Sequence, residues 1–278
     1  MSTTDRSARP GEGPEAPASH RTPRVAAARK LTSRAGRAEA GRFLAEGVQA
    51  VREALAHGTV HELFVTEAAA GRQPELLTRA AGSGVRVTFV TDRAAQLLSD
   101  TVTPQGLVAV CDTVDVGLSA ALAGSPRLVA VLAGVADPGN AGTVLRVADA
   151  AGADAVVFAG GTVDPHNGKC VRASTGSLFH LPVARHRDVA EAIAACRAAG
   201  LRVLAADGYA ESALDTAADL HEPSAWLFGN EAHGLPADVL ALADRGVRVP
   251  LYGAAESLNL ATAAAVCLYA SALAAHRG

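Results

Sequence analysis

Short apolar runs alternate with longer amphipathic stretches along most of the chain, a pattern typical of α/β proteins. In the first part, this pattern predicts a helix over residues 42–57 and then strands separated by helices, which indicates a small three-layer α/β domain. The predicted strands are VHELFVT, VRVTFV and GLVAVCD, and the predicted helices between them are PELLTRAAG and DRAAQLLSD.

The second part has apolar runs without polar alternation, which favours strands buried on both faces of a parallel sheet. Ligands bind such sheets beyond the carboxyl ends of the strands, so the loops there are candidates for chemistry. The predicted strands are RLVAVLAG, ADAVVFAG, LPVAR, LRVLAADG, SAWLFGNE and RVPLYG; the predicted helices are NAGTVLRVADAAG, NGKCVRASTGSLF, VAEAIAACRAAG, ADVLALAD and the C-terminal stretch.

Composition shifts mark the expected boundaries. The first residues are rich in proline, glycine, alanine and acids and lack the apolar core of a signal peptide, while TVDVGLSAALAGSP is small and turn-rich. We therefore expect a disordered tail over residues 1–22, a first domain over 23–114, a linker over 115–125 and a second domain over 126–278.

The chain ends in its longest apolar run, which follows a polar cluster. Because the run is mostly alanine, contains Asn259, Thr262 and Ser271, and has no basic flank before it, we expect a helix in the core or at a subunit interface and no membrane span. Ser257 is expected to cap this helix, with Glu256 near its positive end. Capping explains one of these polar residues, so the cluster needs a further role.

The net charge of −3 hides a basic segment: residues 21–42 carry a charge of +6 and the remainder −9. This asymmetry predicts either a polyanion-binding arm or a solvated, partly disordered leader. Four dispersed cysteines indicate reduced cytoplasm and neither a disulfide framework nor a structural zinc site. His57 and His61 form the single close histidine pair, but they flank Gly58 and a β-branched run, so no metal site is predicted.

Two glycine-containing loops follow predicted strands. In ADPGNAGTVLR, Asn140 is expected to cap a helix that carries Arg146 about two turns in. Dinucleotide binding by an oxidoreductase is the rival interpretation, but GxGxxG is absent and Gly168-Lys169 is followed by Cys170. In GNEAHGLP, the residues could contact a ligand or simply begin the next helix.

Taken together, three motifs resemble those of the SpoU, or TrmH-like, RNA ribose 2′-O-methyltransferases. They are NxGxxxR with AxxxG (Asn140 to Gly152), GNExxGL (Gly229 to Leu235), and VP followed by ESLN (Val249, Pro250, Glu256 to Asn259). VDPHNGKCVRASTGSLFHLPV is similar to the segment between motifs, and KLTSRAGRAEAGRFLAEGVQAVREAL to the family's substrate-binding domain. The resemblance runs from about Arg24 to the C-terminus, with Ala232 and Leu251 as departures from common residues.

The resemblance implies an α/β SPOUT domain with a C-terminal trefoil knot, a homodimer, and S-adenosylmethionine as cofactor. It implies methylation of a ribose 2′-hydroxyl, with 23S ribosomal RNA as the expected substrate. A transfer RNA substrate and a non-catalytic RNA-binding paralogue are the alternatives. The residues that it assigns to catalysis are Arg146, Asn140, Glu231, Ser257 and Asn259, and those that it assigns to the cofactor are Gly229, Val249 and Leu258.

Arg146 resembles the family's catalytic arginine, yet arginine is a weak base at its normal pKa. Phosphate binding and hydroxyl orientation are therefore alternative roles for it. Phe43 and Glu46 are expected to be structural. RNA phosphates are expected to contact Arg29, Lys30, Arg34, Arg37 and Arg42, with no metal involved.

Overall fold

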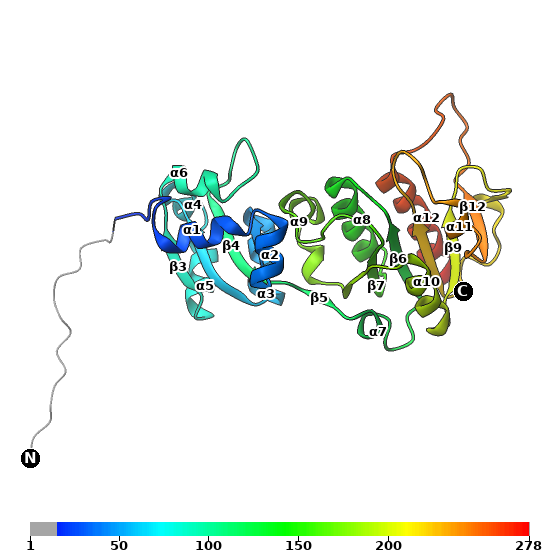
Figure 1. Cartoon of the computed structure of the whole chain (residues 1–278), viewed down its shortest axis with the longest axis horizontal. Helices are drawn as coiled ribbons and strands as arrows, with labels where there is room; N and C mark the ends of the chain where they lie inside the picture. Colours follow the sequence, from blue (N-terminus) through cyan, green and yellow to red (C-terminus); the bar gives the residue numbers. More distant parts are fainter. Residues whose placement is uncertain (1–15, 278) are drawn as a thin grey trace, which may run out of the picture.

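The computed structural model describes residues 16–277 and contains two domains that lie side by side (Figure 1). Most of the predicted tail, residues 1–15, lies outside the described residues. The rest of the predicted tail, residues 16–22, contacts the first domain, so the prediction of disorder is wrong for this part. The Ala18 N–H donates to the Phe89 carbonyl at 2.8 Å, and the Thr91 N–H donates to the Ala18 carbonyl at 3.1 Å.

The first domain is built on a mixed four-stranded sheet in the order β1-β4-β2-β3. Strand β4 pairs antiparallel with both β1 and β2, and β2 pairs parallel with β3. The elements are α1 (Pro23–Lys30), α2 (Arg34–Ala40), β1 (Arg42–Glu46), α3 (Val48–His57), β2 (Val60–Val65), α4 (Glu67–Arg72), α5 (Pro74–Gly82), β3 (Arg86–Phe89), α6 (Asp92–Leu97) and β4 (Leu107–Asp112).

Helices cover both faces of this sheet, as the expected three-layer domain requires. Alternate residues of a strand point to opposite faces. Leu63 therefore packs with α3 and α5 on one face, while Phe64 packs with α1 and α6 on the other. The basic segment is ordered here, because α1 buries Val25 and Ala28 in the second of these cores. The prediction of a solvated leader is wrong for this part.

The helix predicted over residues 42–57 is also wrong in its first half. Residues 42–46 form the edge strand β1, and Gly47, with φ of 94°, separates β1 from α3. Only glycine adopts this backbone conformation readily. Phe43 is a strand residue, fully buried, so its expected role in the core is confirmed.

The second domain contains an eight-stranded sheet in the order β10-β12-β9-β11-β6-β7-β8-β5. Every strand pairing in it is parallel. The elements are β5 (Asp115–Val116), α7 (Leu118–Ala121), β6 (Leu128–Ala133), α8 (Pro138–Ala150), β7 (Ala155–Ala159), α9 (Gly168–Ser174), η1 (Ser177–Phe179), β8 (Val183–His186), α10 (Val189–Ala198), β9 (Arg202–Ala206), β10 (Ser212–Ala213), η2 (Leu214–Thr216), β11 (Ser224–Phe228), α11 (Ala237–Leu240), β12 (Arg245–Arg248) and α12 (Leu260–Ala275).

Two segments differ from expectation. The predicted linker, residues 115–125, adds β5 to the sheet edge beside β8, and α7 packs against that sheet. The strand predicted at RVPLYG is wrong in its position along the chain, because β12 occupies residues 245–248. Pro250, which has no N–H to donate, lies in the loop that follows β12.

The parallel sheet is buried on both faces, as its uninterrupted apolar strands predict. Helices α7 and α10 pack on one face, and α8, α9 and α12 on the other. Helix α12 is fixed to β11 by a buried hydrogen bond of 2.9 Å from Trp226 Nε1 to Ser271 Oγ. Between residues 16 and 277, no helix combines the length and hydropathy needed to cross a membrane.

One continuous buried core joins the two domains. The Phe43 ring lies 4.8 Å from His166 and 5.9 Å from Phe179, both in the second domain. Glu46, also buried, accepts a hydrogen bond from Arg172 Nη1 at 2.9 Å across the same boundary. Its predicted structural role is therefore an interdomain one.

Candidate active site

A pocket of about 360 Å³ opens at the carboxyl ends of β9, β11 and β12. Loops in this position hold the ligands of open parallel sheets. The pocket brings together five of the eight residues that the sequence assigns to catalysis and cofactor binding: Gly229, Glu231, Val249, Ser257 and Leu258. They come from separate motifs that only the folded sheet places together.

The loop after β11 is held in a tight turn. The N–H groups of Asn230 and Gly234 each donate to the other's carbonyl, and the Asn230 side chain accepts from the N–H groups of Ala232 and His233. Asn230 Nδ2 also donates to the Gly134 carbonyl at 3.0 Å. A Cβ at Gly229 would collide with the backbone of Gly234, so glycine is required there. Asn230 is an organising residue for which sequence reasoning gave no specific role.

A chain of hydrogen bonds links the three motifs beside this pocket. Asn259 Nδ2 donates to Asn140 Oδ1 at 3.0 Å, and Asn140 Nδ2 donates to Glu231 Oε1 at 3.0 Å. Glu231 also accepts from the N–H groups of Ala136 and Asp137, each at 3.0 Å. Although burial opposes this shift, these hydrogen bonds, led by that from Asn140, lower the pKa of Glu231 below its ordinary value. Glu231 is therefore a carboxylate at neutral pH.

Asn140 and Ser257 do not cap helices α8 and α12 as expected. Helix α8 is capped by Asp137, whose side chain accepts from the Asn140 N–H at 2.8 Å, so the Asn140 side chain is free for Glu231. Helix α12 is capped by Asn259 rather than Ser257. An aspartate directly before a proline at N1 is a capping signal that could have identified Asp137 from the sequence.

Asp137 has a second partner in Lys169, whose Nζ lies 2.6 Å from Asp137 Oδ2. This hydrogen bond is the main cause that lowers the pKa of Asp137. The pair connects the first turn of α8 to α9. Sequence reasoning assigned no role to either residue.

Arg146 lies outside the pocket. Its side chain is exposed on α8, about 9 Å along the helix from Asn140, and it makes no hydrogen bond or ion pair within residues 16–277. One turn further along the same face, the Ala150 carbonyl accepts from the Tyr269 hydroxyl of α12 at 3.3 Å. Arg146 thus lies on the exposed face of α8.

The five basic residues predicted to contact RNA do not all remain available. Arg37 is buried, with Nη2 2.8 Å and Nε 2.9 Å from Asp164 Oδ2, and its Nη1 donates to the Leu31 and Thr32 carbonyls. Its predicted role in RNA binding is therefore wrong, because a buried and paired guanidinium cannot reach a phosphate. Exposed side chains remain at Arg29, Lys30, Arg34 and Arg42.

Comparison with protein families divides the chain into the same two domains as the structure. Residues 127–269 match the SpoU rRNA Methylase family, and residues 22–109 match the MRM3-like substrate binding domain. The chain is 38% identical to the Bacillus subtilis 23S rRNA (guanosine(2553)-2′-O)-methyltransferase RlmP, over 87% of this chain and 92% of that protein. It is 31% identical to the 23S rRNA (uridine(2479)-2′-O)-methyltransferase of Streptomyces viridochromogenes, over 88% of this chain and 92% of that protein.

Solved structures of methyltransferases are similar to this chain over both domains. The SpoU methyltransferase AviRb from Streptomyces viridochromogenes, in complex with AdoMet, superposes with a TM-score of 0.79 at 30% identity, covering 92% of this chain and 100% of that one. An AdoMet-bound rRNA methyltransferase from Sinorhizobium meliloti also has a TM-score of 0.79, at 31% identity, covering 90% of this chain and 94% of that one. The family resemblance of the motifs is thereby confirmed, and the chain belongs to the SpoU rRNA methylase family, with an MRM3-like substrate-binding domain ahead of its methylase domain.

Proposed function

We propose that the protein transfers a methyl group from S-adenosylmethionine to a ribose 2′-hydroxyl of 23S ribosomal RNA, in the cytoplasm. The observation that carries this proposal is the hydrogen-bonded chain from Asn259 through Asn140 to Glu231, at the edge of the pocket after β11 and β12. The two curated relatives named above methylate the ribose 2′-oxygen of different nucleotides of 23S rRNA. They therefore support 23S rRNA as the substrate and the 2′-hydroxyl as the methylated group, but they do not indicate which nucleotide this protein methylates.

The pocket fits S-adenosylmethionine in its chemistry. Its wall combines apolar side chains, among them Phe228, Leu258 and Leu260, with the glycine-bearing backbone at Gly229. Such a wall can enclose an adenosine while backbone groups hydrogen-bond its polar edge. Gly229, Val249 and Leu258 would hold the cofactor. When bound, S-adenosylmethionine supplies a methyl group that is already electrophilic because its sulfur is a sulfonium.

The protein's own contribution would then be to align the ribose hydroxyl with the methyl group. As the oxygen–carbon bond forms and the sulfur–carbon bond breaks, the hydroxyl proton would pass to water. Asn140 is fixed between Glu231 and Asn259, so its amide has one orientation: Nδ2 faces the carboxylate and Oδ1 faces Asn259. This fixed set, with Ser257 at the pocket rim, would orient the hydroxyl toward the methyl group.

For Arg146 we propose hydroxyl orientation through an RNA phosphate rather than direct proton removal. A guanidinium keeps its charge under all ordinary conditions, so it is a poor base and a good phosphate ligand. Its exposed position, free of partners in the described chain, supports a role that begins when RNA binds.

The first domain would supply RNA affinity. Arg29, Lys30, Arg34 and Arg42 lie exposed on α1, α2 and the start of β1, near one another in sequence and on a body that is otherwise acidic. Contacts of this kind are to phosphates, so they would supply affinity rather than sequence specificity.

We also propose a homodimer that buries one face of α12. Val266, Tyr269 and Leu273 repeat at helical spacing on that face and are 38%, 41% and 51% exposed. Exchanging Leu273 for Glu should lower the mass measured by light scattering from dimer to monomer, whereas Val102→Glu, at a 94% exposed valine of the first domain, should leave it unchanged. A monomeric wild-type protein would contradict the dimer.

A C-terminal trefoil knot remains part of the proposal. It is supported by the path of the chain, which places β12 outside β9 and then returns α12 to pack against α8, β11 and β6. A knotted chain end is rare among protein folds.

The proposed function is tested by transfer of a tritiated methyl group from S-adenosylmethionine to unmodified 23S rRNA, 16S rRNA and total transfer RNA in parallel. We expect label in 23S rRNA alone. Label in transfer RNA would favour the transfer RNA enzyme. RNA binding without label in any arm would favour a non-catalytic paralogue and overturn the proposal.

A further inference from the structure

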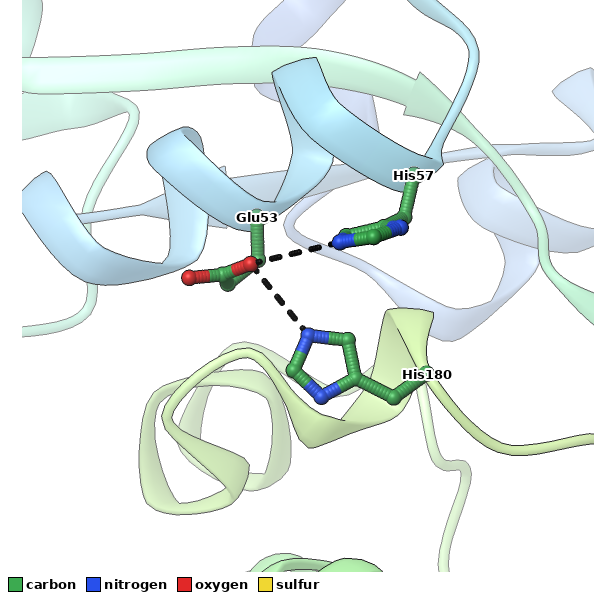
Figure 2. Close-up of side chains that lie close together, drawn as sticks. All are labelled: Glu53, His57 and His180. Atoms are coloured by element: carbon green, nitrogen blue, oxygen red, sulfur yellow. Dashed lines mark hydrogen bonds and ion pairs between the residues drawn. The ribbon is translucent and has the colours of Figure 1, made fainter.

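Three potential metal-binding side chains from both domains meet beside the interdomain core (Figure 2). Glu53 and His57 lie one turn apart on α3, and His180 follows η1 of the second domain. Glu53 Oε2 is 3.2 Å from His180 Nε2 and 3.7 Å from His57 Nε2. All three donor atoms lie within 4.8 Å of one another.

Two glycines allow the backbones to approach closely enough for this arrangement. A Cβ at Gly176, whose φ is 102°, would collide with the Glu53 side chain. A Cβ at Gly58 would come within 3.0 Å of the Phe179 ring. Helix α3 can therefore lie directly against the turn that carries His180.

A second set of residues orients the donors. Asp149 Oδ2 lies 2.8 Å from His180 Nδ1, so a proton on Nδ1 leaves the Nε2 lone pair facing Glu53. Gln49 Nε2 donates to Glu53 Oε1 at 2.7 Å, which leaves Oε2 facing the two imidazoles. Carboxylates behind ligating histidines are a regular feature of zinc sites.

We propose that Glu53, His57 and His180 bind a zinc ion that joins the substrate-binding domain to the methylase domain. Two histidines and one carboxylate are a common zinc ligand set, and ligand distances of about 2.0–2.1 Å place donor atoms roughly 3.3 Å apart in a tetrahedron. The two donor separations from Glu53, 3.2 and 3.7 Å, lie close to this value. The two imidazole donors lie within 4.8 Å of one another, so side-chain rotations would be needed to bring all three donors onto one ion. Glu53 and Asp149 provide two negative charges against the divalent cation.

The site differs from the histidine pair that the sequence offers. His61 Nε2 lies 2.6 Å from Asp112 Oδ1 within the first domain. His57 instead meets a histidine more than a hundred positions along the chain. With the side chain of His57 half exposed, water can supply the fourth ligand.

The experiment is calorimetric titration of the full-length, untagged protein, first stripped of metals, with zinc chloride. We expect one zinc ion per chain. His57→Ala and His180→Ala should each weaken zinc binding by at least about tenfold, and Asp149→Asn by about 10- to 100-fold. His61→Ala is the matched control and should bind zinc like the wild-type protein. Thermal unfolding of each variant verifies that it is folded.

A second readout is the visible spectrum with cobalt(II) in place of zinc, because the coordination geometry of that ion determines its absorption. We expect the intense bands of a four-coordinate site in the wild-type protein and His61→Ala, and their loss in His57→Ala. Absence of stoichiometric zinc binding by the wild-type protein would overturn the proposal and leave the cluster as an ion pair of His180 with Asp149 and Glu53. Equal binding by His57→Ala and the wild-type protein would overturn it as well.

Discussion

Asn259 donates a hydrogen bond from Nδ2 to Asn140 Oδ1 at 3.0 Å, although 119 positions separate the two residues. Through its Oδ1, Asn259 also accepts from the N–H groups of Ala261 and Thr262 and so caps α12. One side chain therefore begins the terminal helix and fixes the polar edge of the pocket. This double role explains why the most apolar helix follows a polar cluster.

The two roles of Asn259 can be separated by substitution. Asn259→Ala should lose the cap, which lowers the free energy of unfolding by about 0.5–2 kcal/mol, and should slow methyl transfer. Asn259→Ser keeps a capping oxygen but cannot reach Asn140, so it should regain stability while transfer stays slow, by about 10- to 100-fold. Urea unfolding and initial rates measure the two effects. Wild-type rates in Asn259→Ser would show that the contact to Asn140 has no part in transfer.

Gly229 should be essential for cofactor binding. A methyl group there would force the loop after β11 apart, because it collides with the Gly234 backbone. We expect Gly229→Ala to weaken S-adenosylmethionine binding by at least about tenfold in calorimetry. Gly253→Ala is a matched control, since a Cβ at this neighbouring loop position meets nothing within 4 Å. Equal affinity in both variants would count against the pocket as the cofactor site.

Arg37 should stabilise the fold rather than bind RNA. Removing one partner of a buried ion pair costs about 3–5 kcal/mol, so Arg37→Ala should lower the free energy of unfolding by that amount. Arg34→Ala, at an exposed site on the same helix, should change it by less than about 0.5 kcal/mol. Chemical denaturation at neutral pH measures both values, and similar effects of the two substitutions would contradict the buried role.

The contribution of Arg37 to the free energy of unfolding should also depend on pH. Although burial opposes the shift, hydrogen bonds from His166 and Arg37 hold the pKa of Asp164 well below its ordinary value. A lowered pKa stabilises the folded protein fully above the unfolded value of about 3.9, and this stabilisation is lost as the pH falls through the folded value. The difference between wild-type and Arg37→Ala should therefore be constant at neutral pH and shrink in acid. A constant difference down to the most acidic pH at which the protein folds would contradict the ion pair as its source.

The exposed basic residues should determine how RNA affinity depends on salt. Replacing Arg29, Lys30, Arg34 and Arg42 together by Ala should weaken RNA binding and reduce the slope of log affinity against log salt. Each phosphate contact that is lost removes roughly 0.7–0.9 from that slope. S-adenosylmethionine affinity should not change. An unchanged slope in a filter-binding series would show that RNA does not contact this segment.

Local pattern was sufficient for most of the elements. Helix α5 coincides with the predicted PELLTRAAG, and β2, β4, β6 and β11 lie within predicted runs, because segments rich in Val, Leu and aromatic residues suit strands. The predicted helix at RFLAE is wrong because five residues carry too little periodicity to distinguish a strand from a helix. Its strand conformation depends on pairing with β4, where Phe43 faces Cys111, and such long-range pairing is not encoded locally.

The sequence motifs predicted candidate residues for the site, but they did not predict how these residues contact one another. The motifs identified Asn140, Glu231 and Asn259 as candidates. The structure adds a series of side-chain hydrogen bonds, from Asn259 to Asn140 and from Asn140 to Glu231. The sequence predicts RNA binding for Arg37 because its charge matches that of its basic neighbours. Its partner Asp164 lies 127 positions away, so its burial became evident only in the folded chain.

The central claim is tested most directly by nucleoside analysis of 23S rRNA incubated with S-adenosylmethionine and either wild-type protein or Arg146→Ala. The wild-type protein should produce a 2′-O-methylated nucleoside at one position, recognised by its resistance to alkaline hydrolysis. Arg146→Ala should bind the cofactor normally and form this product at least about 100-fold more slowly. A methyl group on a base, or no methylated nucleoside from the wild-type protein, would contradict the proposed function, and wild-type turnover by Arg146→Ala would contradict the role of that arginine.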